Sequence, residues 1–397
     1  MGIGAMARAQ RPSLDVPTAI RSLKPMTAGV QPIAAEERHV RIEKARRLMA
    51  AQKIDGVYME RGSTMFYFTG TRELAGLLIP AKGEIVWIVP VTEEQRVHDA
   101  SRVGGKVVTY VESDGPFRAL KRACQDSGTT NIGLEEQVRF GVFEGMRKEL
   151  PAAEFTDATP ITAGCRVIKS KAEIALMQRA ADVTIEAYRA GLATLREGMT
   201  PRELSDHIGA AYQALGFRGE VSVSFGKNTA FPHGSTVAQT LREGDMVLLD
   251  DGCSVEGYQS DITRAVVFGK PSARQKLVWD LERRAQDAAF FAARLGATCE
   301  SVDFAARKAI VDAGFGPGYK LPGLPHRTGH GIGLDIHEWT YMVKGNKTLL
   351  EPGMCFSDEP MIVDNEFGVR LEDCIYMSEA GPRFFSKQSP AIDQPFG

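Results

Sequence analysis

The sequence has few of the features that mark secreted, membrane or nucleic-acid-binding proteins. No run of about 18 apolar residues occurs in the chain, so we expect no helix that spans a membrane. The formal net charge of −2 gives no electrostatic reason to expect binding to nucleic acid or to an acidic surface. Residues 1–29 lack the continuous apolar segment of a signal peptide. These absences predict a cytoplasmic protein with neither a nucleic-acid nor a membrane partner.

The sequence also contains no Cys-x-x-Cys pair. Its six cysteines are far apart in the chain: Cys124, Cys165, Cys253, Cys299, Cys355 and Cys374. We interpret them as buried, reduced thiols, which agrees with a cytoplasmic protein.

The 397 residues are enough for two domains with substantial cores. We expect residues 1–34 to form a loosely structured lead. Residues 35–165 alternate short apolar runs with helical segments, which predicts a compact α/β domain in which residues 65–70, MFYFTG, form a strand. Longer amphipathic helices follow, and we assign residues 166–397 to a second domain.

The second domain contains a weak internal duplication. The spacing from Gly198 to Gly216 equals that from Gly296 to Gly314, and phenylalanine follows the second glycine each time. Each copy holds two helices, then a histidine-bearing segment, then an acidic hairpin. This order predicts two αα-ββ halves that form a curved antiparallel sheet backed by helices, with the hairpin carboxylates on its inner face.

The first acidic hairpin is predicted over residues 246–264, MVLLDDGCSVEGYQSDITR. If its centre lies at Val255 and Glu256, then Asp250 and Asp261 are opposite each other and project to one side. Two bare carboxylates this close would repel, and one would stay protonated unless a cation lay between them.

The second hairpin turns at residues 364–368 and repeats the pattern. Glu359 and Glu372 are opposite each other if the centre lies at Asn365 and Glu366, and Arg370 shares their face. A histidine-rich segment, HRTGHGIGLDIHE, lies between the hairpins and contains His326, His330 and His337. Four carboxylates balance two divalent ions, and an imidazole adds a neutral ligand.

Acidic hairpins are also common as solvated faces. That explanation suits the turn residues Glu256 and Glu366. It suits Asp250 and Glu359 poorly, because both end apolar runs, where an unpaired charge would be costly. We therefore favour a metal centre.

Four segments of the second domain, in this order, resemble the pita-bread metallopeptidases: LLDDGCSVEGYQSDITRAV, HRTGHGIGLDIHE, LEPGMCFSDEP and GVRLEDCIYM. This family includes methionine aminopeptidase, aminopeptidase P and prolidase, with creatinase as a metal-free relative. The N-terminal domain with its FYFTG segment is similar to that of the creatinase and prolidase branch. The resemblance implies an α+β protein, a pita-bread domain behind a creatinase-like α/β domain, nearest to the bacterial Xaa-Pro dipeptidases.

The resemblance also implies a ligand set for two divalent ions. Asp261 and Glu372 would bridge the ions, within a set made up of Asp250, Asp261, His330, Glu359 and Glu372. Strand alternation points Asp251 and Asp358 to the other face, so we leave them out. Ligands rich in oxygen favour Mn²⁺, and Co²⁺, Zn²⁺ and Fe²⁺ are also compatible.

Two ions on either side of a water would lower its pKa, and the resulting hydroxide would attack the scissile carbonyl. Glu359 lies beside this water and could take its proton. The resemblance places His233 near the leaving nitrogen and His337 at the carbonyl, an electrostatic role. A solvated loop position is the alternative for His233.

Two further residues resemble the substrate-binding residues of the family. His326 corresponds to a residue of the P1′ pocket in proline-specific members, with a packing role as the alternative. Arg370 corresponds to an arginine on the substrate side, and its alternative is a salt bridge that orients Glu372.

The sequence departs from the family where some prolidases grip the substrate carboxylate with an arginine. The interval from Glu338 to Asp358 contains no arginine, only Lys344 and Lys347, and Met361 replaces the usual glycine. We expect a homodimer in which Arg72 and Tyr67 reach the partner's active site and Arg72 pairs with the carboxylate. An ordinary surface position is the alternative for Arg72.

Hydrolysis of Xaa-Pro dipeptides is therefore the leading functional prediction. The alternatives are an aminopeptidase P, which releases the N-terminal residue from Xaa-Pro peptides, a dimethylsulfoniopropionate lyase on the same fold, and a binding module without enzyme activity. The ligand set argues against the last.

Overall fold

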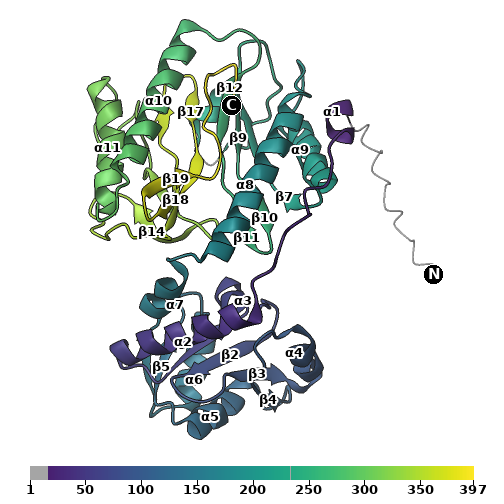
Figure 1. Ribbon diagram of the computed structural model, residues 1–397, viewed down its shortest axis with the longest axis vertical. Coiled ribbons are helices and arrows are strands. Elements are labelled where there is room, and N and C mark those ends of the chain that lie inside the picture. Colours follow the sequence, from purple (N-terminus) through teal and green to yellow (C-terminus); the bar gives the residue numbers. More distant parts are fainter. Residues whose placement is uncertain (1–16, 233) are drawn as a thin grey trace, which may run out of the picture.

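The computed structural model describes residues 17–232 and 234–397 and has two lobes (Figure 1). The N-terminal lobe is built on one sheet, and the C-terminal lobe places four long helices around a set of antiparallel strands. No helix in these ranges is long and apolar enough to cross a membrane. The α+β architecture expected from the sequence is confirmed.

The N-terminal domain has a six-stranded sheet of order β4-β3-β2-β1-β5-β6. β2 runs antiparallel to both β1 and β3, and the remaining neighbours are parallel. The strands are β1 (Gly56–Glu60), β2 (Gly76–Pro80), β3 (Val86–Pro90), β4 (Lys106–Tyr110), β5 (Asn131–Leu134) and β6 (Glu154–Asp157). The helices are α2 (Ala35–Gln52), α3 (Ser63–Thr69), α4 (Glu94–Ala100), α5 (Pro116–Ser127), α6 (Phe140–Glu149) and α7 (Thr159–Arg166), with a 3₁₀ turn η1 (Val91–Glu93).

The strand expected at residues 65–70 is wrong, because this segment forms most of α3. The preference of aromatic residues for strands depends on packing against a neighbouring strand, and this segment does not pair with one. Gly70 ends the helix with a φ of 85°, a left-handed conformation that suits glycine. Arg38 then donates to the carbonyls of Phe66 (2.6 Å) and Tyr67 (3.1 Å) in the last turn.

The described part of the predicted lead is packed rather than loose. Helix α1 (Thr18–Arg21) contacts the helices of the C-terminal domain, and Ile20 is buried. Farther along, the amide of Met26 donates to the carbonyl of Leu215 (2.9 Å), and Ile33 is buried. Burial of these apolar side chains offsets the entropy lost on ordering the segment. The rest of the lead, residues 1–16, lies outside the described residues.

The C-terminal domain consists of two helix pairs and their hairpins, as the duplication predicted. The helices are α8 (Lys171–Leu192), α9 (Pro201–Leu215), α10 (Ala273–Ala292) and α11 (Cys299–Asp312). Three of them begin with a capping box, at Ser170, Thr200 and Ser272, which fixes where each helix starts. In the view of Figure 1, α10 and α11 lie to the left of the strands, and α8 and α9 lie to the right.

The strands form four small sheets of order β12-β9-β8, β11-β10-β7, β14-β13-β15-β18-β19 and β16-β17. In the first half they are β7 (Arg218–Gly219), β8 (Ser222–Phe225), β9 (Met246–Asp250), β10 (Cys253–Val255), β11 (Tyr258–Gln259) and β12 (Arg264–Val267), with a 3₁₀ turn η2 (Gly226–Ala230). In the second they are β13 (Gly329–Gly331), β14 (Glu338–Met342), β15 (Cys355–Asp358), β16 (Met361–Val363), β17 (Gly368–Arg370), β18 (Asp373–Ser378) and β19 (Gly381–Phe384).

The second hairpin has the predicted register. Asp358 pairs with Asp373 and Met361 with Arg370, which places Glu359 opposite the residue before Asp373, namely Glu372. The centre of the hairpin therefore lies where the sequence placed it.

The first hairpin has a different register from the one expected. Its two turn residues are Glu256 (φ 50°) and Gly257 (φ 87°), both left-handed, as in a two-residue hairpin turn. Ser254 consequently pairs with Gln259, and the same register places Thr263 opposite Asp250. The prediction that Asp261 lies directly opposite Asp250 is wrong.

A backbone bridge connects the two acidic hairpins. Thr263, just before β12, and Glu372, just before β18, form an isolated antiparallel bridge with two backbone hydrogen bonds of 3.2 Å. This bridge joins the two acidic hairpins and defines where their carboxylates come together.

Candidate metal centre

Four of the five predicted ligands form a buried cluster. The side chains of Asp261, His330 and Glu372 each offer a ligand atom within 4.8 Å of the others. His330 Nε2 lies 3.2 Å from Glu359 Oε1 and 3.5 Å from Asp261 Oδ2. The two hairpins and β13 therefore converge on one point, as the sequence predicted.

His330 presents a neutral nitrogen to this cluster. Its Nδ1 lies 3.0 Å from the carbonyl of Gly331, so the tautomer with hydrogen on Nδ1 leaves the Nε2 lone pair facing the carboxylates. Burial lowers the pKa of His330 to about 4, so the ring is uncharged at neutral pH. Its own amide donates to Ser357 Oγ (2.9 Å), and that hydroxyl in turn donates to Glu359 (3.1 Å).

Asp250, the fifth predicted ligand, is held at the edge of the cluster. Its carboxylate pairs with the guanidinium of Arg370 and accepts a hydrogen bond from Thr263 Oγ1 (2.6 Å). Burial opposes ionisation, but these two donors keep its pKa below the ordinary value. Arg370 thus orients Asp250, whereas the alternative drawn from the sequence had it orient Glu372.

Thr263 is the link between Asp250 and the rest of the cluster. Its hydroxyl lies 2.6 Å from both Asp250 Oδ1 and Glu372 Oε2, and it accepts from Arg370 Nε (3.1 Å). One hydroxyl proton cannot serve two carboxylates at once. The sequence analysis missed Thr263 because it considered only charged residues and histidines as candidates. Thr263 follows Asp261 by two positions in the same predicted strand, and this spacing could have indicated that both side chains share a face.

The donor set fits divalent cations. Burial, and then repulsion among the carboxylates, raises the pKa of Asp261 and of Glu372 well above the ordinary values. Glu372 Oε1 is buried and has no hydrogen-bond partner among the described residues. A cation among these oxygens would satisfy that atom and remove the repulsion, and oxygen donors with one imidazole suit such an ion.

His337 borders the cluster from the solvent side. Its ring stands edge-on to that of His330, with 4.2 Å between the ring centroids. Partial desolvation is the largest cause that lowers the pKa of His337 to about 4, and the electrostatic effect of His330 is the next. His337 is therefore also uncharged at neutral pH.

Glu338, the next residue, points the other way and anchors the loop. Its carboxylate accepts from Lys169 Nζ (3.0 Å) and from the amide of Leu334 (2.8 Å), and it pairs with Arg166. Burial opposes ionisation, but Lys169 and Arg166 lower the pKa of Glu338 to about 2. This network reaches the N-terminal domain, because Arg166 also donates to Thr64 of α3 (3.1 Å).

The remaining predicted residues have different positions. His326 is half-buried, with Nδ1 against the carbonyl of Arg327 (2.6 Å) and a buried Nε2 that has no partner in the described part of the chain. His233 lies outside the described residues. The carboxylate of Asp251 accepts hydrogen bonds from the amide and the hydroxyl of Ser222.

The expectation that Tyr67 reaches a partner subunit is wrong. Tyr67 is buried, its hydroxyl donates to the carbonyl of Cys165 (2.9 Å), and its ring lies 4.1 Å from the guanidinium of Arg41. It belongs to the junction between the domains. Arg72 is exposed, with its guanidinium 4.8 Å from the ring of Phe66, and its role stays a prediction.

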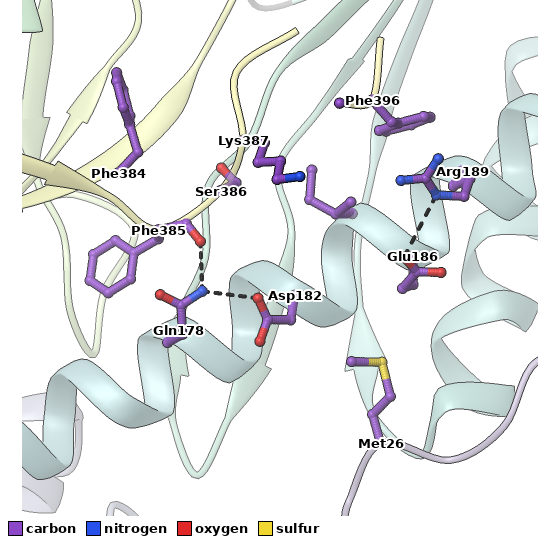
Figure 2. Close-up of a pocket in the computed structure, with 12 residues that line it drawn as sticks. Met26, Gln178, Asp182, Glu186, Arg189, Phe384, Phe385, Ser386, Lys387 and Phe396 are labelled. Atoms are coloured by element: carbon purple, nitrogen blue, oxygen red, sulfur yellow. Dashed lines mark hydrogen bonds and ion pairs between the residues drawn. The ribbon is translucent and has the colours of Figure 1, made fainter. Parts of the chain in front are cut away.

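A separate pocket of about 520 Å³ lies between α8 and the chain after β19 (Figure 2). Its lining includes Gln178, Asp182, Arg189, Phe384 and Lys387. None of the predicted ligands or catalytic residues contributes to it. All six cysteines are buried elsewhere, and none is in a disulfide.

Comparison with known proteins identifies relatives over most of the chain. The model of metallopeptidase family M24 matches residues 175–379, and that of the creatinase/prolidase N-terminal domain matches residues 41–168. An Xaa-Pro dipeptidase of Pyrococcus furiosus is 30% identical over 87% of this chain and 97% of its own length. One of Lactobacillus delbrueckii subsp. lactis is 31% identical over 88% and 98%.

Solved structures agree with these matches. Dipeptidase PepE from Mycobacterium ulcerans has a TM-score of 0.83 at 28% identity and covers 90% of this chain and 97% of its own. Prolidase from Thermococcus sibiricus has a TM-score of 0.80 at 29% identity, and the match covers 88% of this chain and 97% of that one. These matches confirm the resemblance that the sequence motifs carried. The protein is a metallopeptidase that belongs to family M24, with a creatinase/prolidase N-terminal domain ahead of the catalytic domain.

Proposed function

We propose that this protein hydrolyses Xaa-Pro dipeptides with the help of two divalent metal ions. The oxygen-rich ligand set favours Mn²⁺. One observation carries the proposal: Asp261, His330, Glu359 and Glu372 converge in a buried cluster with Asp250 beside them. The names of the relatives at about 30% identity support the substrate class.

The five residues would hold the ions, with Asp261 and Glu372 shared between them. When bound, divalent ions would supply a Lewis acid for the scissile carbonyl and would lower the pKa of the attacking water. Arg370 keeps Asp250 ionised and oriented, and Thr263 fixes the spacing of Asp250 from Glu372.

Glu359 is the candidate to take the proton of the attacking water. Its carboxylate is fixed by Ser357 and lies 3.2 Å from His330 Nε2, on the side of the cluster that faces the histidine segment. A prolyl nitrogen carries no hydrogen and must be protonated to leave, so the proton accepted by Glu359 can be returned there, with His233 as the second donor in this proposal.

His337 would stabilise the carbonyl oxygen rather than protonate the leaving group. With a pKa of about 4 it carries no charge at neutral pH, and it can offer one N–H to developing negative charge. His326, with its free buried Nε2, is suited to a polar contact in the P1′ pocket.

The test is a comparison of substrates and metal content. Purified without chelator, the protein should contain close to two divalent ions per chain and cleave Gly-Pro and Ala-Pro faster than Ala-Pro-Ala. Faster release of the N-terminal alanine from the tripeptide would favour an aminopeptidase P. The absence of an arginine between Glu338 and Asp358 supports this alternative. Cleavage of dimethylsulfoniopropionate without peptidase activity would favour the lyase.

A further inference from the structure

The Thr263–Glu372 bridge is supported from behind by a buried arginine, Arg264. Its side chain is fully buried and lies on the face of the strands away from the metal centre, because neighbouring residues of a strand alternate in direction. Arg264 Nη1 donates to the carbonyl of Thr263 (3.0 Å) and to that of Glu372 (2.9 Å). Those two oxygens are the acceptors of the bridge itself.

The other end of the guanidinium binds the second half of the domain. Arg264 Nη2 donates to Asp373 Oδ1 (2.7 Å) and to the carbonyl of Lys387 (2.9 Å). Asp373 is also held by Gln286 of α10, which donates to Oδ2 (3.1 Å). A single planar group thus connects the start of β12, the start of β18 and the segment after β19 with four hydrogen bonds.

The segment after β19 is in turn fixed to the first half. Gln178 of α8 donates to the carbonyl of Phe385 (2.6 Å), and Figure 2 shows this contact beside Ser386 and Lys387. The amide of Phe385 donates to the carbonyl of Cys374 in β18 (3.0 Å). Arg264 therefore lies where the two halves are connected, and its side chain is fully buried.

We propose that Arg264 is a positioning residue for the metal centre: it fixes the distance between Asp261 and Glu372, the carboxylates that two ions would share. This inference rests on the proposed dinuclear function. The two carboxylates come from different halves, and the backbone bridge that joins their hairpins is the one whose carbonyls Arg264 binds. Loss of the guanidinium would leave both halves folded but their spacing less defined.

The test measures metal binding, with Mn²⁺ alone and then Co²⁺ alone as probes. In Arg264→Met, the affinity for at least one of the two ions should fall by about 10–100-fold, the usual cost of removing a residue that orients metal ligands. Arg264→Lys keeps the charge but cannot make four bonds, so it should bind with intermediate affinity. It also supplies the folded variant if Arg264→Met does not fold. The absorption spectrum of the Co²⁺ form should change in both variants, because the ligand geometry changes.

Arg283→Met is the matched control. Arg283 lies on α10 and donates to Asp287, Gln388, the carbonyl of Ser389 and, at 3.4 Å, Gln286, but not to the bridge. Its loss should lower the melting temperature without a change in metal affinity or in the Co²⁺ spectrum.

The outcomes separate the two proposals. If the wild-type chain binds no divalent ions, the proposed function fails. If the wild type binds two ions, and a folded Arg264→Lys or Arg264→Met binds both with unchanged affinity and spectrum, the positioning role is wrong. Equal losses of metal affinity in the Arg264 variants and in Arg283→Met would mean that the arginine acts through general stability alone, which also overturns the inference.

Discussion

Asp261 and Glu372 are buried carboxyls whose pKa values are raised, first by burial and then by neighbouring carboxylates. Without metal, the folded state holds protons that the unfolded chain releases above about pH 4. In the metal-free protein, the contribution of these groups to the free energy of unfolding is therefore highest at low pH. It falls as the pH rises toward the pKa values that Asp261 and Glu372 have in the folded state. The melting temperature with chelator should therefore drop between about pH 5 and 8 relative to that of Asp261→Asn, and excess Mn²⁺ should remove the drop. The prediction would be contradicted if, with chelator present, the melting temperatures of the wild type and of Asp261→Asn changed in parallel with pH.

Removal of a shared ligand should have a larger effect on metal content than removal of a neighbouring acid. Asp261→Ala and Glu372→Ala should each lose at least one ion per chain by elemental analysis and lose most of their peptidase activity. Asp251→Ala is the control, because that carboxylate accepts hydrogen bonds from Ser222 and does not belong to the group of candidate metal ligands. It should keep both ions. Full activity in either ligand variant would exclude the proposed centre.

His337 makes its contribution without holding metal in our proposal. Loss of one positioned donor to developing charge typically costs on the order of 10²–10³ in turnover. We expect that loss in kcat for His337→Ala, with metal content unchanged. The dependence of kcat on pH between about pH 6 and 8 should be the same in the variant and the wild type, because the pKa of His337, about 4, lies below this range. Turnover within a factor of a few of wild type would show that the assignment is wrong.

At the level of secondary-structure elements, the two hairpins show what sequence reasoning could and could not predict. Apolar runs that end in acidic residues located both hairpins, and the expected pairing put the carboxylates near each other. The register of the second followed from its turn, whereas in the first the left-handed turn residues Glu256 and Gly257 moved the centre by one position. Such a shift depends on backbone conformation in the turn, which composition does not determine. Helix α3 was missed for a similar reason: its capping contact comes from Arg38, which is distant in sequence.

Glu338 holds the loop between β13 and β14, and its loss should be costly. A buried carboxylate paired with Arg166 and Lys169 cannot be removed without leaving those cations unpaired, which typically costs about 3–5 kcal/mol. We expect that decrease in the free energy of unfolding for Glu338→Ala, measured in urea, and less than about 0.5 kcal/mol for the exposed control Glu351→Ala. Because its pKa is about 2, the contribution of Glu338 is present above about pH 4.5 and lost as the pH falls toward 2. Similar values for the two variants would contradict the assignment.

For the whole molecule, the substrate carboxylate still needs a partner. We propose a homodimer in which Arg72 supplies it, since Arg72 is exposed and makes no ion pair in the described chain beyond its contact with the ring of Phe66. Arg72→Ala should raise KM for Xaa-Pro dipeptides several-fold more than for their C-terminal amides, and sedimentation should show a dimer. The exposed Lys344, tested as Lys344→Ala, is the comparison. A fully active monomer, or equal effects on free and amidated substrates, would remove this role.

The sequence predicted a division into two domains, but it did not predict the contacts at their junction. The change in helix length near residue 166 is a local signal, and it was sufficient to expect two units. The junction itself is made by polar side chains from distant segments, for example Ser63 with Asp335 (2.5 Å) and Arg166 with Asp335 (2.6 Å). Charged residues of this kind look the same in sequence whether they face solvent or each other.

The charged network at that junction limits how the protein can be dissected. Arg166 and Lys169 precede α8, yet both bind Glu338, which is deep in the C-terminal domain. A fragment that starts at α8 would keep every predicted metal ligand and lose both cations, so Glu338 would be buried with no countercharge. Proteolysis or truncation just before residue 171 should therefore give an insoluble catalytic half. A cut before α7 would keep both cations with their carboxylate.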